Sequence, residues 1–147
     1  MCGYAIEWSP ANNWSAIKHR GLKETQIIHK FEDNEDRMTH FKLPFQTELN
    51  DDFNQPILLA NGNYLLFNGE IFNIPPGFEN DVEYLTHFFG NDYSLTKVGG
   101  EEYNSWDGFW SIAIVTPEGV CAFTDPLGQK QLSFNENGIA SEMKALI

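Results

Sequence analysis

The segment ILLANGNYLLFNGEIFN, residues 57–73, carries the strongest secondary-structure signal in the chain. Two apolar runs, 57–60 and 63–67, flank the pair Asn61-Gly62. An Asn-Gly pair between apolar runs is typical of a two-residue type I′ turn, because both turn positions need a positive φ that Asn and Gly tolerate. The segment therefore predicts a β-hairpin.

A second pair of this kind, Asn68-Gly69, lies in the same segment. Taken alone, it favours a second hairpin turn. The functional alternative is an oxyanion hole, in which an Asn side-chain amide and a Gly backbone N–H converge on one point. The local pattern leaves both readings open.

Further strands and short helices are expected on both sides of this hairpin. Strands are expected at 2–8, 25–31, 40–45, 109–115, 120–125 and 131–134, and helices at 13–18, 81–89, 101–106 and 142–146. Hairpin connections dominate this order. The sequence therefore predicts one α+β domain over residues 1–147, with mostly antiparallel sheets and helices on their outer faces.

The helix at 81–89 has the clearest boundaries. Asn80 precedes it as an N-cap, Glu83 completes a capping box, and Gly90 ends it. Asp81 at its start has two readings: a carboxylate that complements the helix dipole, which the local pattern favours, or a counter-ion for a substrate ammonium group.

The composition is that of a globular and acidic protein. Apolar residues make up 41% of the 147 residues, and the formal net charge is −12. Non-specific binding to nucleic acid or to an anionic membrane surface is therefore disfavoured. Two acidic runs, 32–36 and 50–52, are expected to be solvated loops.

Cysteine and histidine usage suggests a reducing compartment and no metal site. The chain has two cysteines and four scattered histidines, without the spacing of metal ligands. Cys121 lies in an apolar run and is expected in the core. No stretch has the length of a membrane span, and the N-terminus lacks the pattern of a signal peptide. A cytoplasmic protein without metal or cofactor is expected.

Cys2 follows the initiator methionine directly. Removal of Met1, which a small second residue favours, would give Cys2 both a thiol and a free α-amine. An α-amine has a pKa of about 7.7–8.0 and can take the proton of a thiol near neutral pH. Cys2 would then be a nucleophile with its own base.

Two basic residues are candidates for holding a substrate carboxylate. Arg20 lies in a polar segment after the first predicted helix, and Lys42 lies in an expected strand. Taken singly, each favours an ordinary surface position.

Together, these segments resemble one family. The chain is similar to the glutaminase domain of class II glutamine amidotransferases, which are N-terminal-nucleophile hydrolases, and most of all to that of asparagine synthetase. The resemblance rests on eight motifs in the family's order: Met1-Cys2-Gly3, His19-Arg20-Gly21, His40-Phe41-Lys42-Leu43-Pro44, Asn68-Gly69-Glu70-Ile71-Phe72-Asn73, Asn80-Asp81-Val82-Glu83, Asp107-Gly108-Phe109-Trp110-Ser111-Ile112-Ala113, Thr124-Asp125-Pro126-Leu127-Gly128-Gln129-Lys130-Gln131-Leu132 and Ala140-Ser141-Glu142-Met143-Lys144-Ala145-Leu146.

The resemblance implies a fold and a role for each candidate residue. The fold would be a four-layer αββα sandwich. Cys2 would be the nucleophile, and Asn68 and Gly69 the oxyanion hole. The glutamine substrate would be held by Glu70, Asp81, Lys42 and Arg20, with Glu70 and Asp81 on its α-amine and Lys42 on its α-carboxylate.

The chain also departs from the family pattern. Lys42 stands where the family has an Arg, and a lysine offers a point charge in place of a bidentate fork. His19-Arg20-Gly21 is followed by Leu22 and not by Pro-Asp. No Ser-Gly-Gly-x-Asp-Ser pyrophosphate loop is present, so activation of an acceptor by ATP is not expected of this chain.

The sequence thus predicts a glutaminase that releases ammonia and glutamate through a thioester on Cys2 and supplies a separate synthetase protein. One alternative is a non-catalytic module that senses glutamine or docks on a synthetase. Another is a hydrolase of a different small amide.

Overall fold

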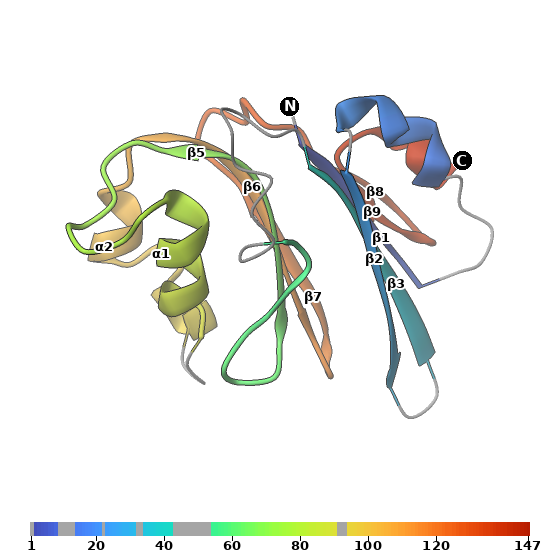
Figure 1. Cartoon of the computed structure of the whole chain (residues 1–147), viewed down its shortest axis with the longest axis horizontal. Helices are drawn as coiled ribbons and strands as arrows, with labels where there is room; N and C mark the ends of the chain where they lie inside the picture. Colours follow the sequence, from blue (N-terminus) through green and yellow to red (C-terminus); the bar gives the residue numbers. More distant parts are fainter. Residues whose placement is uncertain (1, 9–13, 22, 32–33, 43–53, 91–93) are drawn as a thin grey trace.

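The computed structural model describes residues 2–8, 14–21, 23–31, 34–42, 54–90 and 94–147. It contains two antiparallel sheets that face each other, with a few short helices beside them (Figure 1). The predicted fold class, α+β with mostly antiparallel sheets, is confirmed.

The N-terminal strand lies inside a five-stranded sheet. The strand order is β2-β3-β1-β9-β8. The strands are β1 (Gly3–Glu7), β2 (Lys23–Phe31), β3 (Asn34–Lys42), β8 (Ser133–Asn135) and β9 (Gly138–Ala140). Because β1 pairs with β3 on one side and with β9 on the other, the start of the chain is held from both edges.

The second sheet contains the strand from segment 57–73. Its strands, in spatial order, are β4 (Ile57–Leu58), β5 (Tyr64–Ile71), β6 (Gly108–Thr116) and β7 (Gly119–Thr124). β5 pairs with β6 along its whole length, from Tyr64↔Val115 to Ile71↔Gly108.

The helices are short. They are η1 (Trp14–Arg20), α1 (Asp81–Phe88), η3 (Ser94–Lys97), α2 (Glu101–Asn104) and η4 (Met143–Leu146), of which the η elements are 3₁₀ helices. The predicted N-cap of α1 is confirmed: the Asn80 side chain accepts a hydrogen bond from the Glu83 N–H at 2.8 Å. The Glu83 carboxylate accepts the N–H of Glu79, one residue before the position that a capping box requires. Among the described residues, no helix is long and apolar enough to cross a membrane.

Hydrophobic side chains form three separate clusters. The first lies between the β4–β7 sheet and α1 and α2, and includes Phe67, Leu85 and Trp110. The second contains Tyr4, Ile6, Met38, Leu66, Ala113 and Val115, which come from both sheets. The third joins β1, β3 and β9 to η1 and η4, and includes Ala5, Ile17, Phe41, Ala140, Ala145 and Leu146. Alternate residues of β1 therefore face different clusters.

Both Asn-Gly predictions need correction. The first hairpin exists, but the Leu59 N–H bonds the Asn63 carbonyl at 2.8 Å, which leaves a three-residue loop in place of a type I′ turn. Asn68-Gly69 is not a turn: both residues lie within β5, opposite Ser111 and Trp110. The reason is the long pairing of β5 with β6, which continues through the pair.

Two burial predictions are also wrong. The acidic run was expected to be a loop, but its described part, 34–36, begins β3, and Asp36 is buried opposite His29. The run is extended because it pairs with β2. Cys121 is exposed and not in the core, since β7 is the edge strand of its sheet. The acidic run 50–52 lies outside the described residues.

Candidate active site

Cys2 lies at one end of the two facing sheets. It directly precedes β1, whose residues Tyr4 and Ile6 face the cluster between the sheets while Ala5 faces the other way. The alternation of β1 therefore directs Cys2 toward the second sheet. In Figure 1 the connection from β7 to β8, drawn in orange-red, runs past the end of the sheet at which β1 begins.

Asn68 lies in the four-stranded sheet, and its side chain is directed toward the five-stranded sheet that Cys2 precedes. Leu66 belongs to the cluster between the sheets, so the alternate residues Asn68 and Glu70 face the same way. Asn68 is 4% exposed and lies opposite Ser111. The hydroxyls of Ser111 and Tyr4 lie near each other, but their geometry is not that of a full hydrogen bond. Burial raises the pKa of Tyr4, and the nearby Ser111 hydroxyl lowers it in part. The two sheets therefore meet close to Asn68.

The Gly69 N–H is directed away from β6. Its cross-strand partner Trp110 uses both backbone groups toward Asp125, accepting from Asp125 N–H at 2.9 Å and donating to its carboxylate at 3.2 Å. The pair Gly69↔Trp110 is thus one of the non-hydrogen-bonded pairs of the β5–β6 ladder. The N–H groups of Phe67 and Ile71 point to the same edge, where they bond Gln55 and Asp81 side chains.

Only glycine fits at position 69. Its φ is +140°, and a Cβ built there would lie 2.0 Å from the carbonyl oxygen of Phe109. This close approach keeps the backbone of β5 against β6 at the residue that directly follows Asn68. An oxyanion hole requires two donors, and the candidates here, the Asn68 amide and the Gly69 N–H, belong to adjacent residues of β5.

Lys130 connects the two sheets, and the sequence reasoning gave it no role. Its ammonium lies 5.0 Å from the centre of the Phe109 ring, and Phe109 is the cross-strand partner of Glu70. Burial and the Arg20 guanidinium lower the pKa of Lys130, while the charges of Cys2, Glu70 and Asp125 act in the opposite direction. Lys130 therefore lies within electrostatic reach of Cys2 and Glu70.

Asp125 fixes the loop that carries Lys130. Its buried carboxylate accepts the backbone N–H groups of Trp110, Leu127, Gln129 and Lys130 at 3.1–3.3 Å. Burial alone would raise the pKa of Asp125, but these four donors lower it. The Asp-x₄-Lys spacing of Asp125 and Lys130 could have indicated the role of Lys130 from the sequence. A carboxylate that accepts the N–H groups of a turn also positions the residue that follows the turn.

Asp81 joins the start of α1 to the end of β5. Its carboxylate accepts the Ile71 N–H at 3.2 Å. Burial raises the pKa of Asp81, the Ile71 and Val82 N–H groups lower it, and the Glu70 carboxylate raises it further. Glu70 and Asp81 are therefore neighbours, and an ammonium group between them would relieve their repulsion.

Lys42 ends β3 beside the position of Cys2. The pairing of β1 with β3 ends at Gly3↔Phe41, and the next residues along the two strands are Cys2 and Lys42. Burial and the Lys42 charge lower the pKa of His40 to about 3, so His40 is neutral. The expected segment 40–45 is a strand as far as Lys42; residues 43–45 lie outside the described residues.

Arg20 is not the surface cation that its local pattern favoured. Its side chain is 13% exposed and pairs with Glu142, Nη1 to Oε1 at 2.7 Å. Its Nε donates to the Cys2 carbonyl at 3.1 Å. The guanidinium therefore holds the backbone of the candidate nucleophile.

The structure thus gathers the candidate residues at one end of the sheets. The charges of Cys2, Arg20 and Glu70 all influence the pKa of Lys130, and the charge of Glu70 influences that of Asp81. Among the described residues, no group of three histidine, cysteine or acidic side chains could hold a metal ion.

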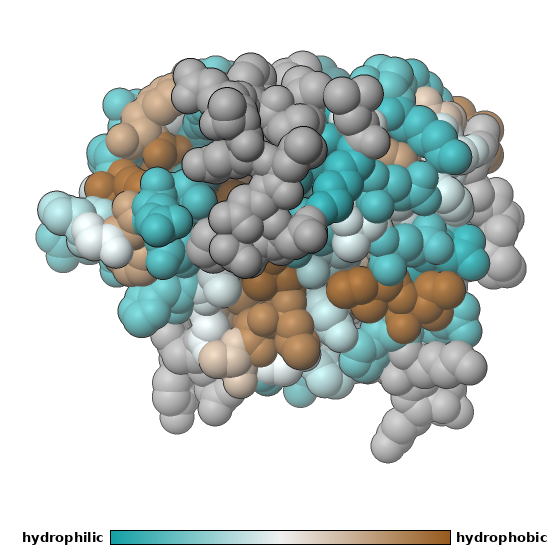
Figure 2. All heavy atoms as spheres, in the orientation of Figure 1, coloured by the Kyte–Doolittle hydropathy of each residue, from teal (hydrophilic) through white to brown (hydrophobic). Residues whose placement is uncertain are grey.

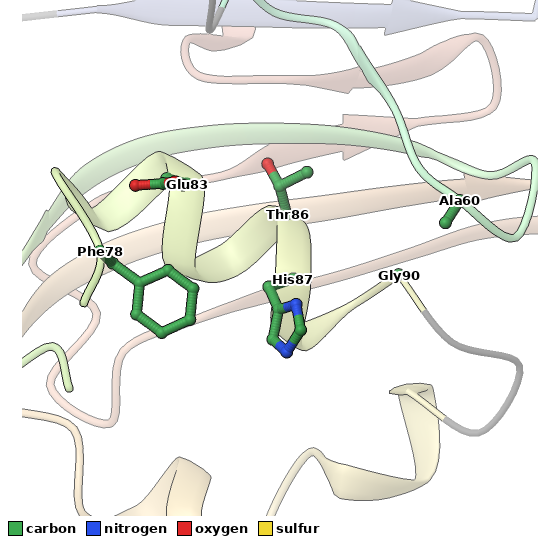
Figure 3. Close-up of a pocket in the computed structure, with 6 residues that line it drawn as sticks. All are labelled: Ala60, Phe78, Glu83, Thr86, His87 and Gly90. Carbon is green, nitrogen blue, oxygen red and sulfur yellow. The ribbon is translucent and has the colours of Figure 1, made fainter. Parts of the chain in front are cut away.

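A separate open groove of about 510 Å³ lies on α1, away from these residues (Figure 3). It is lined by Ala60, Phe78, Glu83, Thr86, His87 and Gly90. The Phe78 and His87 rings, 5.6 Å apart, point to the same side of α1. The groove contains none of the candidate active-site residues.

No protein-family model matches the chain, and no curated protein matches it.

Proposed function

We propose that the protein is a class II glutamine amidotransferase, a glutaminase whose nucleophile is the N-terminal cysteine. One observation carries the proposal: the Lys130 ammonium, which lies 5.0 Å from the ring of Phe109, the cross-strand partner of Glu70, is also close enough to Cys2 for the Cys2 charge to raise the pKa of Lys130. Residues far apart in sequence that a thiol amidohydrolase needs therefore lie around one point.

In the proposed reaction, the α-amine of Cys2, free once Met1 is removed, accepts the thiol proton. The thiolate attacks the side-chain carboxamide carbon of glutamine and forms a tetrahedral oxyanion. Asn68 Nδ2 and the Gly69 N–H stabilise this oxyanion, at roughly 3–4 kcal/mol for each donor in comparable sites. The C–N bond breaks, the leaving nitrogen takes the proton from the α-ammonium, and ammonia departs. Water then hydrolyses the thioester and releases glutamate.

The ends of the substrate would be held by charges of opposite sign. Glu70 and Asp81, which repel each other, suit the α-ammonium group. Lys42, next to Cys2 in the register of β1 and β3, suits the α-carboxylate. We assign Arg20, whose Nε and Nη1 contact Cys2 and Glu142, to holding the nucleophile as well as to the substrate pocket.

We also propose the four-layer αββα arrangement of N-terminal-nucleophile hydrolases. The three hydrophobic clusters support it, because three buried interfaces in a row imply four layers. The proposal further includes a cytoplasmic location, which would keep the thiol reduced, and a separate synthetase protein as acceptor of the ammonia.

The test compares glutamate release by three proteins: wild type, Cys2→Ala and Cys121→Ala. Cys121 is the second cysteine and is exposed, so its substitution controls for general thiol chemistry. The proposal predicts release by wild type and Cys121→Ala, and none above background by Cys2→Ala. Equal release by all three would refute it.

The second candidate is a module that binds glutamine without hydrolysing it. The single ammonium of Lys42 favours this, since it positions a carboxylate less strictly than a guanidinium fork. Calorimetry that detects glutamine binding to a protein with a free Cys2 amine, together with no release of ammonia, would select this candidate.

A further inference from the structure

The C-terminal segment Ser141-Glu142 contacts the start of the chain at two points. Ser141 Oγ accepts the Tyr4 N–H at 3.0 Å, and the Ser141 N–H donates to the Tyr4 carbonyl at 2.9 Å. The next residue, Glu142, binds Arg20, whose Nε reaches the Cys2 carbonyl. One dipeptide is thus connected to Tyr4 directly and to Cys2 through one intermediate side chain.

Gly3 makes the second connection possible. A Cβ at this position would lie 2.4 Å from Arg20 Cδ and 2.5 Å from Nε. The Arg20 side chain therefore crosses the backbone at Gly3, and its guanidinium reaches Cys2 on one side and Glu142 on the other. No other residue type leaves that path open without moving the arginine.

Glu142 is anchored more firmly than a surface carboxylate. Its oxygens lie 2.7 Å from Arg20 Nη1, 3.0 Å from His19 Nε2 and 3.1 Å from Lys144 Nζ. Burial alone would raise the pKa of Glu142, but the hydrogen bonds from Arg20 and Lys144 lower it to about 2. The carboxylate is therefore charged at any working pH, and it faces Arg20, the least exposed of these three bases.

We infer that Glu142 is a positioning residue for the Cys2 nucleophile and acts through Arg20. By fixing the guanidinium, it holds the Cys2 carbonyl and hence limits where the α-amine and the thiol can lie. This inference rests on the proposed function, but it concerns a residue that touches neither substrate nor thiol. Without the Glu142 carboxylate, the partly buried Arg20 guanidinium would lose its ion-pair partner. An unpaired charge at this position is unfavourable, so the arginine would move.

The experiment makes two kinds of measurement in a Cys121→Ala background, where Cys2 is the remaining thiol. The first is kcat and KM for glutamine, and the second is alkylation of Cys2 by iodoacetamide. The variants are Glu142→Ala, Glu142→Gln, Lys144→Ala and Arg20→Ala, with the double variant of Glu142 and Arg20. Lys144→Ala is the matched control, because Lys144 binds Oε2 of Glu142 at 3.1 Å, whereas Arg20 binds Oε1 at 2.7 Å.

Glu142→Ala is expected to lower kcat between about tenfold and about a hundredfold, because small displacements of a reacting group have effects of this size. KM is expected to change less than kcat, because Arg20 belongs to the proposed substrate pocket but the charged ends of glutamine are assigned to Glu70, Asp81 and Lys42. Alkylation of Cys2 is expected to become several-fold faster, since the released terminus is more accessible. Glu142→Gln, which keeps an acceptor oxygen for Arg20, should lie between, and Lys144→Ala should match its parent.

The double variant shows whether the effect of Glu142 on Cys2 passes through Arg20. If Glu142 acts through Arg20, then Glu142→Ala adds nothing to the effect of Arg20→Ala. Full additivity of the two effects, or Glu142→Ala rates equal to those of Lys144→Ala, would overturn the inference. If the parent does not hydrolyse glutamine, the proposed function falls and the alkylation rates alone decide the positioning role. If Glu142→Ala does not fold, the same comparison is made with Glu142→Gln.

Discussion

Two glycines set the distances in the proposed site. Gly69 lets β5 approach the Phe109 carbonyl, and Gly3 lets the Arg20 side chain cross β1. Neither is a hairpin residue, although the Asn-Gly pattern favoured a turn at Gly69. At the scale of single residues, the absence of a side chain matters as much as the groups that react.

Gly69→Ala is expected to affect both stability and activity. The new Cβ would overlap the Phe109 carbonyl, so β5 must shift. We expect a loss of about 1–3 kcal/mol in the free energy of unfolding and at least a hundredfold lower glutamate release, roughly the value of one oxyanion donor. Urea unfolding and a glutamate assay measure these.

The control is Gly119→Ala. Gly119 has a similar φ of +144°, but no atom lies within 4 Å of a built Cβ. It therefore carries the conformational strain without the overlap. Equal losses in the two variants would contradict the role given to the close approach at Gly69.

Lys42→Arg is expected to improve glutamine binding. A guanidinium can bind the α-carboxylate through two parallel hydrogen bonds where an ammonium offers a point charge. We expect KM to fall by up to about tenfold with kcat little changed. Lys23→Arg is the control, because Lys23 lies directly opposite Lys42 on β2. A Lys42→Met variant with wild-type KM would show that this residue does not bind substrate.

At the scale of elements, β1 joins the nucleophile to a buried carboxylate at its other end. Glu7 is 3% exposed, and Arg37 Nη1 lies 3.9 Å from its Oε2. Burial raises the pKa of Glu7 to about 7, although the Arg37 charge and the Trp14 N–H act against this. The end of β1 opposite Cys2 is therefore sensitive to pH.

The raised pKa of Glu7 predicts how stability changes with pH. The folded state binds the proton more tightly than the unfolded state, whose Glu pKa is 4.5. The stabilisation is present below that value and is lost as pH rises through about 7. Between pH of about 5 and about 8, we expect wild type to lose about 2–3 kcal/mol relative to Glu7→Gln.

Urea unfolding of both proteins at the two pH values measures this difference. Glu118→Gln, at an exposed position, serves as the control and should follow wild type. A constant gap between wild type and Glu7→Gln across the pH range would show that Glu7 does not titrate near neutrality.

Elements with local signals were predicted well. α1 follows from the Asn80 cap, and β5 and β6 follow from their apolar residues. The expected helix at 142–146 is a 3₁₀ helix, η4, and the expected helix at 13–18 is η1, described from Trp14. The errors at 34–36 and at Asn68-Gly69 have one cause, pairing with a neighbouring strand, which is β2 for 34–36 and β6 for Asn68-Gly69. Cys121 is exposed because β7 lies at the edge of its sheet, and the local pattern shows neither the pairing nor the edge position.

At the scale of the molecule, the site depends on how the two sheets face each other. Cys2 and Asn68 could be nominated from the sequence by their chemistry and motifs. Lys130 had only the Asp-x₄-Lys spacing as a signal and Glu142 had none, because their importance comes from the charges of Cys2 and Glu70 and from the bond to Arg20 across the fold. Long-range pairing therefore adds the supporting residues to a site whose reacting groups the sequence already suggests.

The outer surface gives less information than the interior. Figure 2 shows hydrophobic side chains interspersed with hydrophilic ones on one face. The exposed large hydrophobics come from several elements, among them Phe72, Leu127 and Phe134. Their scatter is ordinary for a folded protein and does not define a partner surface.

The central claim is that glutamine is attacked by the thiol of a chain that begins at Cys2. Its most direct test is mass spectrometry of protein mixed briefly with glutamine and quenched in acid. We predict a γ-glutamyl thioester on Cys2 of the chain that has lost Met1, and none on the chain that keeps it. Glutamate release by the Met1-bearing chain at the same rate, or an adduct on Cys121 alone, would contradict the account.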